Sequence, residues 1–192
     1  MTIDADRPQP NPVSVAGDDP PAVVVMGVSG AGKTVIGEAL ASAIGARFIE
    51  GDKLQPEENV ARMAAGLPLT DELRAGWLER VGMEIAAARA SGVAAVAACS
   101  ALKRAYRSKL RELNPSLVFI HLELDPETAR ARVATRKGHF MPASLVDSQF
   151  ATLERPGLDE FAFSLNALRP IEDLVDTAAS FIRNSTKKRA AP

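Results

Sequence analysis

Cysteine is almost absent from the sequence: Cys99 is the only one, so no disulfide can form within the chain. This scarcity is typical of proteins that work in a reducing compartment, and we expect a cytoplasmic location. No apolar run approaches the roughly 20 residues that span a bilayer, so no membrane partner is expected. Residues 1–21 lack the basic and apolar regions of a secretory signal, and their prolines and acidic residues predict a disordered segment.

An excess of charge of either sign is also missing. The 192 residues include 23 Lys and Arg against 24 Asp and Glu, which gives a formal net charge of -1. This balance gives no support for a nucleic-acid partner, and none is expected. Hydrophobic residues make up 46% of the chain, which is enough for the core of one domain. We expect that domain over residues 22–184, followed by a frayed tail at 185–192.

Short apolar runs alternate with amphipathic stretches along the domain. The runs that predict strands are 22–26, 46–52, 93–99, 116–124 and 161–168. The stretches that predict helices are 33–45, 56–66, 70–92, 101–113, 126–136, 143–154 and 171–184. Strands that alternate with helices indicate an α/β fold, with a five-stranded parallel sheet flanked by helices.

The segment from Gly27 to Thr34, GVSGAGKT, fits the phosphate-binding pattern G-x-x-x-x-G-K-[ST] in full. It follows a predicted strand and opens a predicted helix, the context in which this P-loop pattern binds a nucleoside triphosphate. Lys33 is predicted to contact the β- and γ-phosphates, and the Thr34 hydroxyl to be a ligand of Mg²⁺. The predicted nucleotide-binding residues of this loop are Gly27, Val28, Ser29, Gly30, Ala31, Gly32, Lys33 and Thr34.

Other motifs decide where the terminal phosphate goes. A GTPase switch needs Asn-Lys-x-Asp and, after the third strand, Asp-x-x-Gly, and neither string occurs. The third predicted strand ends in Cys99-Ser100, so the usual acidic Mg²⁺ residue is missing there as well. A motor ATPase is unexpected in a chain of this size. The sequence therefore predicts a small kinase that places a second substrate against the γ-phosphate.

Two places can supply the acceptor site of such a kinase. Asp52 follows the second predicted strand, at the edge where ligands bind in open α/β sheets, and its carboxylate can orient or deprotonate a hydroxyl. A turn or helix-capping role is the alternative for Asp52. The basic helix after Ser100 offers Lys103 and Arg107, one turn apart near the same edge, while its outer cations are expected to be solvated.

Phosphoryl transfer to a hydroxyl must exclude water, which requires a lid over the phosphates. Arg132 and Arg136 lie four residues apart and lead into the loop KGHFMP, so they can neutralise charge on the moving phosphoryl group. An ordinary pair of exposed arginines is the alternative. His139 is either a substrate contact or a plain loop residue.

Several strings together resemble gluconate kinases of the thermoresistant type, a branch of the P-loop kinases with a nucleoside-monophosphate-kinase-like fold. The matching stretches are MGVSGAGKT, EGDKLQPEENVARMAAGLPLTD, GWL, CSALKRAYRSKLRE and TRKGHFMPASLVDSQFATLE, spread over about residues 22–160. The loop is shared by a vast superfamily, whereas CSALKRAYR and RKGHFMPASLVDSQF are far more specific. The chain departs from the family's pattern at Gln55, where His is frequent, and at Arg62, where Lys is frequent.

The resemblance implies ATP-dependent phosphorylation of D-gluconate at its 6-hydroxyl, giving 6-phosphogluconate and ADP, by a cytoplasmic homodimer. It also implies an acceptor-binding arm at 51–76 and a lid at 136–142. The expected catalytic residues are Lys33, Asp52 and Arg136, and Arg132 is expected to bind the nucleotide. Gluconate needs cationic and polar partners for its carboxylate and hydroxyls. The candidates are Asp52, Asn59, Arg62, Arg74, Lys103, Arg107 and His139, whereas Trp77 is expected to pack against its neighbours.

Two other functions stay open at this point. One is a kinase of another small anion, such as shikimate or a nucleoside monophosphate. The other is a regulatory module that binds a nucleotide without transfer chemistry, and the lid-like RKGHFMP and the basic helix argue against it.

Overall fold

The computed structural model describes residues 20–135 and 144–187. The predicted N-terminal disordered segment therefore lies almost entirely outside the described residues. The predicted lid, with Arg136 and His139, and the end of the predicted tail also lie outside them. Within the described part of the chain, no helix is both long and apolar enough to cross a membrane.

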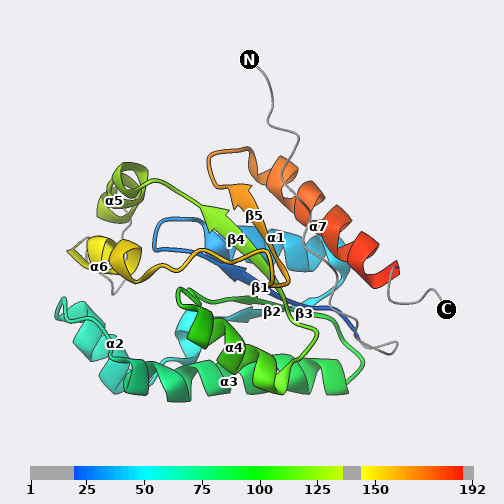
Figure 1. The fold of residues 1–192 in the computed structure, drawn as a ribbon, viewed down its shortest axis with the longest axis horizontal. Helices are drawn as coiled ribbons and strands as arrows, with labels where there is room; N and C mark the ends of the chain where they lie inside the picture. Colours follow the sequence, from blue (N-terminus) through cyan, green and yellow to red (C-terminus); the bar gives the residue numbers. More distant parts are fainter. Residues whose placement is uncertain (1–19, 136–143, 188–192) are drawn as a thin grey trace.

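The centre of the fold is a parallel sheet whose middle strand is the first in the sequence (Figure 1). Its strands are β1 (Ala22–Met26), β2 (Arg47–Glu50), β3 (Ala95–Ala98), β4 (Val118–Glu123) and β5 (Ala162–Asn166). Their order across the sheet is β2-β3-β1-β4-β5, and every neighbouring pair is parallel. β1 is buried along its whole length, as the continuous apolar run AVVVM requires. The predicted five-stranded parallel sheet is confirmed.

Helices cover both faces of this sheet. One layer consists of α1 (Lys33–Ile44) and α7 (Ile171–Lys187), and the other of α3 (Asp71–Ala90) and α4 (Arg104–Leu113) (Figure 1). Alternate side chains of a strand point to opposite faces, so β1 contributes to both layers. Val23 and Val25 join the core under α1 and α7, whereas Val24 and Met26 join the core under α3 and α4.

The remaining helices gather at one end of the sheet, beyond the carboxyl ends of the strands (Figure 1). They are a short 3-10 helix, η1 (Gly51–Leu54), followed by α2 (Glu57–Ala64), α5 (Pro126–Thr135) and α6 (Ser144–Thr152). η1 and α2 continue from β2, and α5 continues from β4. The phosphate loop between β1 and α1 lies at the same edge, because all strands run in the same direction.

Most element boundaries differ from the sequence prediction by a few residues, and those of β2, α4 and α7 are examples. β2 ends at Glu50, and Asp52 belongs to η1 because the Glu50 carboxylate accepts a hydrogen bond from the Asp52 N–H and closes the turn. α4 begins only at Arg104, since Ala101 has a φ of 44° and cannot be part of a right-handed helix. α7 continues to Lys187, beyond its predicted end at residue 184.

β4 carries a buried histidine, His121, beside the central strand. It pairs with Met26 in the sheet, and only 1% of its surface is exposed. Its Nδ1 lies 3.2 Å from the Ser164 hydroxyl on β5. Burial lowers the pKa of His121 from its ordinary value of 6.5 to about 4, because an imidazolium loses its hydration inside the protein. The side chain is therefore neutral at physiological pH.

We expect the protein to lose stability as the pH falls from 6.5 towards 4. In this interval the unfolded chain binds a proton at His121 that the folded chain does not, so acid favours unfolding by up to about 3 kcal/mol. His121→Gln cannot titrate and should flatten this part of the pH dependence. Urea unfolding of both proteins at a series of pH values measures the free energy of unfolding, and parallel curves would contradict the prediction.

Candidate active site

The phosphate loop, Gly27 to Thr34, connects β1 to α1 at the edge of the sheet. Gly30 has a φ of 84°, and a Cβ there would lie 3.0 Å from the Ala129 carbonyl oxygen of α5, so the position requires glycine. The Lys33 ammonium donates to the Val28 carbonyl at 3.1 Å and therefore lies against the loop. The loop leads directly into the N-terminus of α1, so its backbone N–H groups lie next to a helix N-terminus, as phosphate binding requires.

A cavity of about 210 Å³ opens beside this loop. Lys33 and Thr34 of α1, Asp52 of η1 and Arg132 of α5 line it. The rest of its wall comes from Ser29, Gly30, Gly32 and Val35. The structure thus brings two cations, a hydroxyl and a carboxylate, all of them predicted site residues, into one cavity.

Asp52 reaches the cavity from a turn that is held on two sides. The indole N–H of Trp77 on α3 donates to the Gly51 carbonyl at 2.7 Å. A Cβ on Gly51 would lie 2.3 Å from the Ala98 carbonyl oxygen of β3, so only glycine allows this approach. The Asp52 N–H donates to the Glu50 carboxylate at 3.4 Å. Trp77 is 2% exposed, which confirms its predicted packing role, and its indole also positions the turn that carries Asp52.

Arg132 lines the cavity from α5 and is held against the phosphate loop. Its guanidinium donates to the Gly30 carbonyl at 3.2 Å and to the Ala167 carbonyl at 3.4 Å. α5 begins at Pro126 as predicted, and the Asp125 side chain caps its first turn. Among the contacts that the structure describes, two backbone carbonyl oxygens, and no carboxylate, position the Arg132 guanidinium.

A second polar group, the Tyr106 cluster, consists of Asp71, Arg74, Lys103 and Tyr106 and joins the start of α3 to α4. The Lys103 ammonium donates to both Asp71 carboxylate oxygens at 2.8 Å, and the Tyr106 hydroxyl donates to the same carboxylate at 2.5 Å. Arg74 donates to that hydroxyl at 3.2 Å. Both cations lie over the tyrosine ring, 5.6 and 5.5 Å from its centre. Hydrogen bonds from Lys103 and Tyr106 keep the pKa of Asp71 below its usual value.

Two further predicted acceptor-binding residues, Asn59 and Arg62, lie on α2 and, like Arg74 and Lys103, do not line the cavity. The Asn59 amide donates to Gln55 Oε1 at 3.0 Å and to the Leu73 carbonyl at 3.1 Å. Its Oδ1 is buried with no hydrogen-bond partner among the described residues. Arg62 Nε donates to the Pro68 carbonyl at 2.9 Å. In the described structure these side chains hold α2 against α3 and the connection between them.

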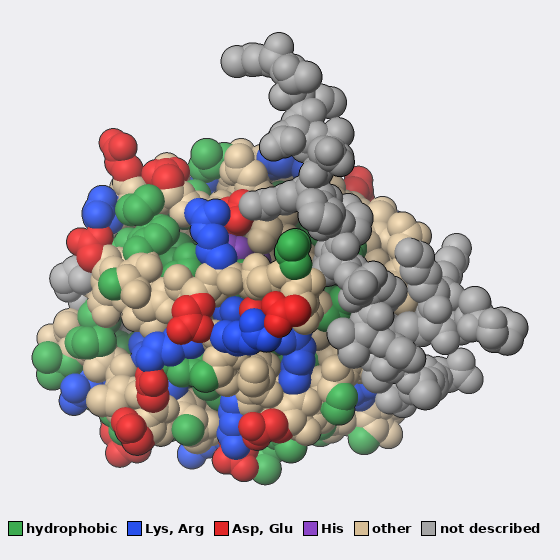
Figure 2. Space-filling view, in the orientation of Figure 1, with side chains coloured by type: hydrophobic (Ala, Val, Ile, Leu, Met, Phe, Trp, Pro, Cys, Tyr) green, Lys and Arg blue, Asp and Glu red, His purple; other side chains and the backbone are tan. Residues whose placement is uncertain are grey.

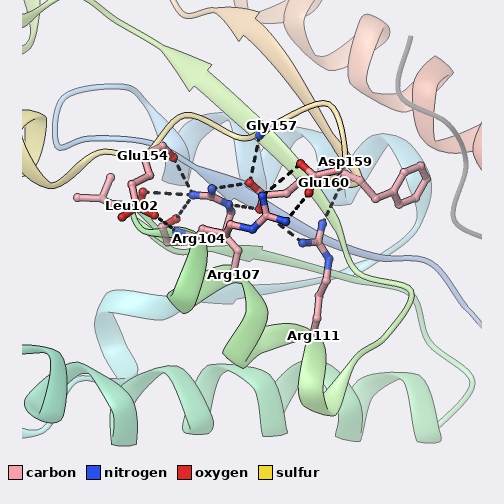
Figure 3. Close-up of polar contacts among 10 residues, drawn as sticks. Leu102, Arg104, Arg107, Arg111, Glu154, Gly157, Asp159 and Glu160 are labelled. Carbon is pink, nitrogen blue, oxygen red and sulfur yellow. Dashed lines mark hydrogen bonds and ion pairs between the residues drawn. The ribbon is translucent and has the colours of Figure 1, made fainter.

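Arg107 is fully buried and is not available to an acceptor, which corrects its predicted role. Its guanidinium donates to both carboxylate oxygens of Glu160, at 2.6 and 2.7 Å, and to the carbonyls of Ala101, Leu102 and Glu154 (Figure 3). Burial is the largest single influence on Glu160 and by itself would raise its pKa. The hydrogen bonds from Arg107 and from the Gly157 N–H, together with the charges of Arg107 and Arg111, outweigh it and lower that pKa. A buried guanidinium needs such a complete set of acceptors, so Arg107 is a structural residue.

The outer cations of α4 belong to a surface region of mixed charge (Figure 2). Arg104 pairs with Asp159 and Lys109 with Glu112, and the side chains of both cations are exposed, as predicted. Arg111 differs, because its guanidinium packs over the Phe119 ring, and burial lowers its pKa.

Three residues that position the site were not predicted from the sequence: Tyr106, Gln149 and Glu160. Tyr106 is the only tyrosine of the chain, and its place among basic residues was the available signal. Gln149 on α6 forms hydrogen bonds to Ser29 of the phosphate loop, 120 residues away, and no local pattern indicates this contact. Glu160 lies in the loop before β5, where a carboxylate ordinarily is solvated.

Several curated relatives of this chain are named gluconokinases. A family model described as an AAA domain matches residues 23–156, which include the phosphate loop, Asp52 and the Tyr106 cluster. A gluconokinase of Gluconobacter oxydans is 48% identical over 138 residues, covering 72% of this chain and 78% of the relative. The thermosensitive gluconokinase of Escherichia coli is 45% identical over 137 residues, covering 71% and 73%.

A solved structure agrees with these relatives. A gluconokinase from Sinorhizobium meliloti superposes with a TM-score of 0.78 at 42% sequence identity, covering 88% of this chain and 95% of the other. The match therefore extends to the fold as well as to the sequence. On these similarities, the chain belongs to the gluconokinase family of P-loop kinases.

Proposed function

We propose that this protein is a gluconokinase, which transfers the γ-phosphate of ATP to the 6-hydroxyl of D-gluconate and releases 6-phosphogluconate and ADP. The observation that carries the proposal is the cavity that Asp52 shares with Lys33, Thr34 and Arg132 beside the phosphate loop. Membership of the gluconokinase family supports the identity of the acceptor. A homodimer in the cytoplasm is part of the proposal and rests on the family resemblance.

Transfer requires a hydroxyl oxygen in line with the γ-phosphorus, and the hydroxyl must lose its proton as the new bond forms. In the proposed mechanism the Asp52 carboxylate orients the 6-hydroxyl and accepts that proton. The bond from O6 to the γ-phosphorus forms while the bond from that phosphorus to the β,γ-bridging oxygen breaks, which leaves ADP. Lys33 and Arg132 stabilise the negative charge on the moving phosphoryl group.

The donor atoms of the cavity fit a Mg²⁺ ion that is held mainly by the triphosphate. Mg²⁺ prefers oxygen ligands and usually keeps several waters, with one or two protein ligands. The Thr34 hydroxyl is the proposed protein ligand, and the Asp52 carboxylate offers a further oxygen on the same cavity wall. When bound, the ion would neutralise charge on the β- and γ-phosphates.

For the acceptor, the proposal assigns the gluconate carboxylate to Arg74 and Lys103 of the Tyr106 cluster. The cluster holds both cations over one tyrosine ring, and paired cations are suited to a carboxylate. Asp71 already pairs with Lys103, so the acceptor would share this lysine with Asp71. Arg62 is proposed as a further acceptor contact. Asn59 is only 1% exposed, so its predicted role as an acceptor contact is corrected to a structural one, as for Arg107. Arg136 and His139, which lie outside the described residues, keep their predicted roles in the proposal.

A panel of acceptors tests the proposed function. Release of ADP from ATP is followed by a coupled assay with gluconate, shikimate and several nucleoside monophosphates in parallel. We expect gluconate to raise ADP release about 100-fold or more above the ATPase background, because a kinase transfers phosphate to its own acceptor much faster than to water. ADP release with another acceptor but not with gluconate would overturn the proposal, and a flat response to every acceptor would favour a nucleotide-binding module.

Asp52→Asn should lower kcat by about 10²–10⁴-fold, the usual contribution of a general base, and leave the KM for ATP nearly unchanged. The amide keeps the size of the side chain but cannot accept the proton. Lys33→Ala is the comparison, because it removes the charge that contacts the phosphates and should abolish turnover in a folded protein. Circular dichroism checks the fold of both variants. A kcat close to that of the wild type for Asp52→Asn would assign Asp52 a structural role in the η1 turn.

Trp77→Phe should lower kcat by about 10-fold with little change in the KM for ATP, because the turn that carries Asp52 loses the indole donor at Gly51. The buried Ile85→Val on the same helix is the control, since it costs about 1 kcal/mol of stability without touching that turn. Steady-state kinetics and thermal melting of both variants separate the two effects. Equal losses of kcat in the two variants would mean general destabilisation and would count against a positioning role for Trp77.

A further inference from the structure

A side chain of α6 forms a two-point contact with the phosphate loop. Gln149 Oε1 accepts a hydrogen bond from the Ser29 N–H at 2.7 Å, and Gln149 Nε2 donates to the Ser29 hydroxyl at 3.2 Å. Ser29 is 7% exposed and Gln149 is 8% exposed, so water competes little for these bonds. Together the two bonds define the orientation of one residue in the loop, because they hold its backbone and its side chain at the same time.

The composition of the loop explains why such an external contact matters. Gly27, Gly30 and Gly32 all have positive φ angles, and glycine has little conformational preference of its own. A loop of this kind does not hold its N–H groups in one direction without partners. Phosphate binding needs those N–H groups to converge, so the partners that order the loop before the nucleotide arrives improve its affinity.

Two helices next to the loop in space donate to or accept from its polar atoms. Arg132 of α5 donates to the Gly30 carbonyl at 3.2 Å, one residue after the Gln149 contact at Ser29. Arg130 and Asp147 form an ion pair between α5 and α6, but both side chains are exposed, and such a pair contributes little to the order of the loop. Gln149 of α6 therefore holds Ser29, and Arg132 of α5 holds the next residue, Gly30, so the two helices fix this two-residue segment from either side.

We propose that Gln149 is a positioning residue for the nucleotide, which acts through Ser29 and sets the affinity of the phosphate loop for ATP. The inference rests on the proposed function only in naming the reaction that uses ATP. The affinity of the loop for ATP does not depend on the acceptor. Without the Gln149 amide, the backbone at Ser29 would have to be ordered when ATP binds, and the free-energy cost would appear as a higher KM for ATP. The acceptor, which binds elsewhere in the proposed site, should not be affected.

Gln149→Met tests this, because methionine has a similar length and removes both hydrogen bonds. We expect the Kd for ATP, measured by calorimetry, and the KM for ATP to rise about 10-fold, with the KM for gluconate unchanged within about twofold. Asp147→Asn is the matched control on the same helix: it breaks the exposed ion pair to Arg130 without touching the loop, and it should leave the Kd for ATP unchanged. Gln149→Ala replaces the methionine variant if the latter does not fold.

A double-mutant cycle with Ser29→Ala shows whether Gln149 acts through Ser29. Ser29→Ala alone should raise the Kd for ATP about threefold, but it should add almost nothing in the Gln149 variant, because contacting residues are not additive. Additive effects would overturn the proposal. So would an unchanged Kd for ATP, or equal increases in the KM values of both substrates, which a merely structural residue would produce. The calorimetric result does not depend on gluconate turnover, so a protein inactive towards gluconate would refute the proposed function and still test this inference.

Discussion

A guanidinium without access to water must find all its hydrogen-bond acceptors inside the protein, and this constraint at Arg107 organises one side of the molecule. Its five bonds reach the Glu160 carboxylate and the carbonyls of Ala101, Leu102 and Glu154. The loop after β3 and the segment between α6 and β5 are therefore tied to α4 at one point. Breaking such a buried pair typically costs about 3–5 kcal/mol, so these segments have little freedom to rearrange.

The polar atoms of the phosphate loop also find their partners inside the protein. The loop backbone is rich in glycine and has few side chains of its own, so α5 and α6 supply Arg132 and Gln149 to its polar atoms. α6 thus contacts the loop through Gln149, and the segment after α6 contacts α4 through Arg107. The nucleotide side of the cavity and the helix that carries Tyr106 belong to one connected frame, although they are far apart in the sequence.

The features predicted correctly are those that depend on neighbours in the sequence. The apolar run of β1, the loop pattern up to Thr34 and the start of α5 at Pro126 are all local signals, and the structure has them where they were expected. Asp52 could be placed near the phosphate loop because the carboxyl ends of parallel strands meet at one edge. Lys103 and Arg107 could not be told apart, because the phase of α4 relative to the core depends on where the helix starts, and Ala101 delays that start to Arg104.

The sequence by itself determined the phosphate loop, the parallel α/β architecture and, through family-specific stretches, the kind of kinase, because each of these signals acts over a few residues. Tertiary structure alone decided the order of the strands, which side chains share the cavity, and that Arg107 is buried while Lys103 remains beside Asp71. The physical reason is that a cation is kept in the core only if a carboxylate and several carbonyls meet it there. Its partner Glu160 is 53 residues away, and only the folded chain brings the two together.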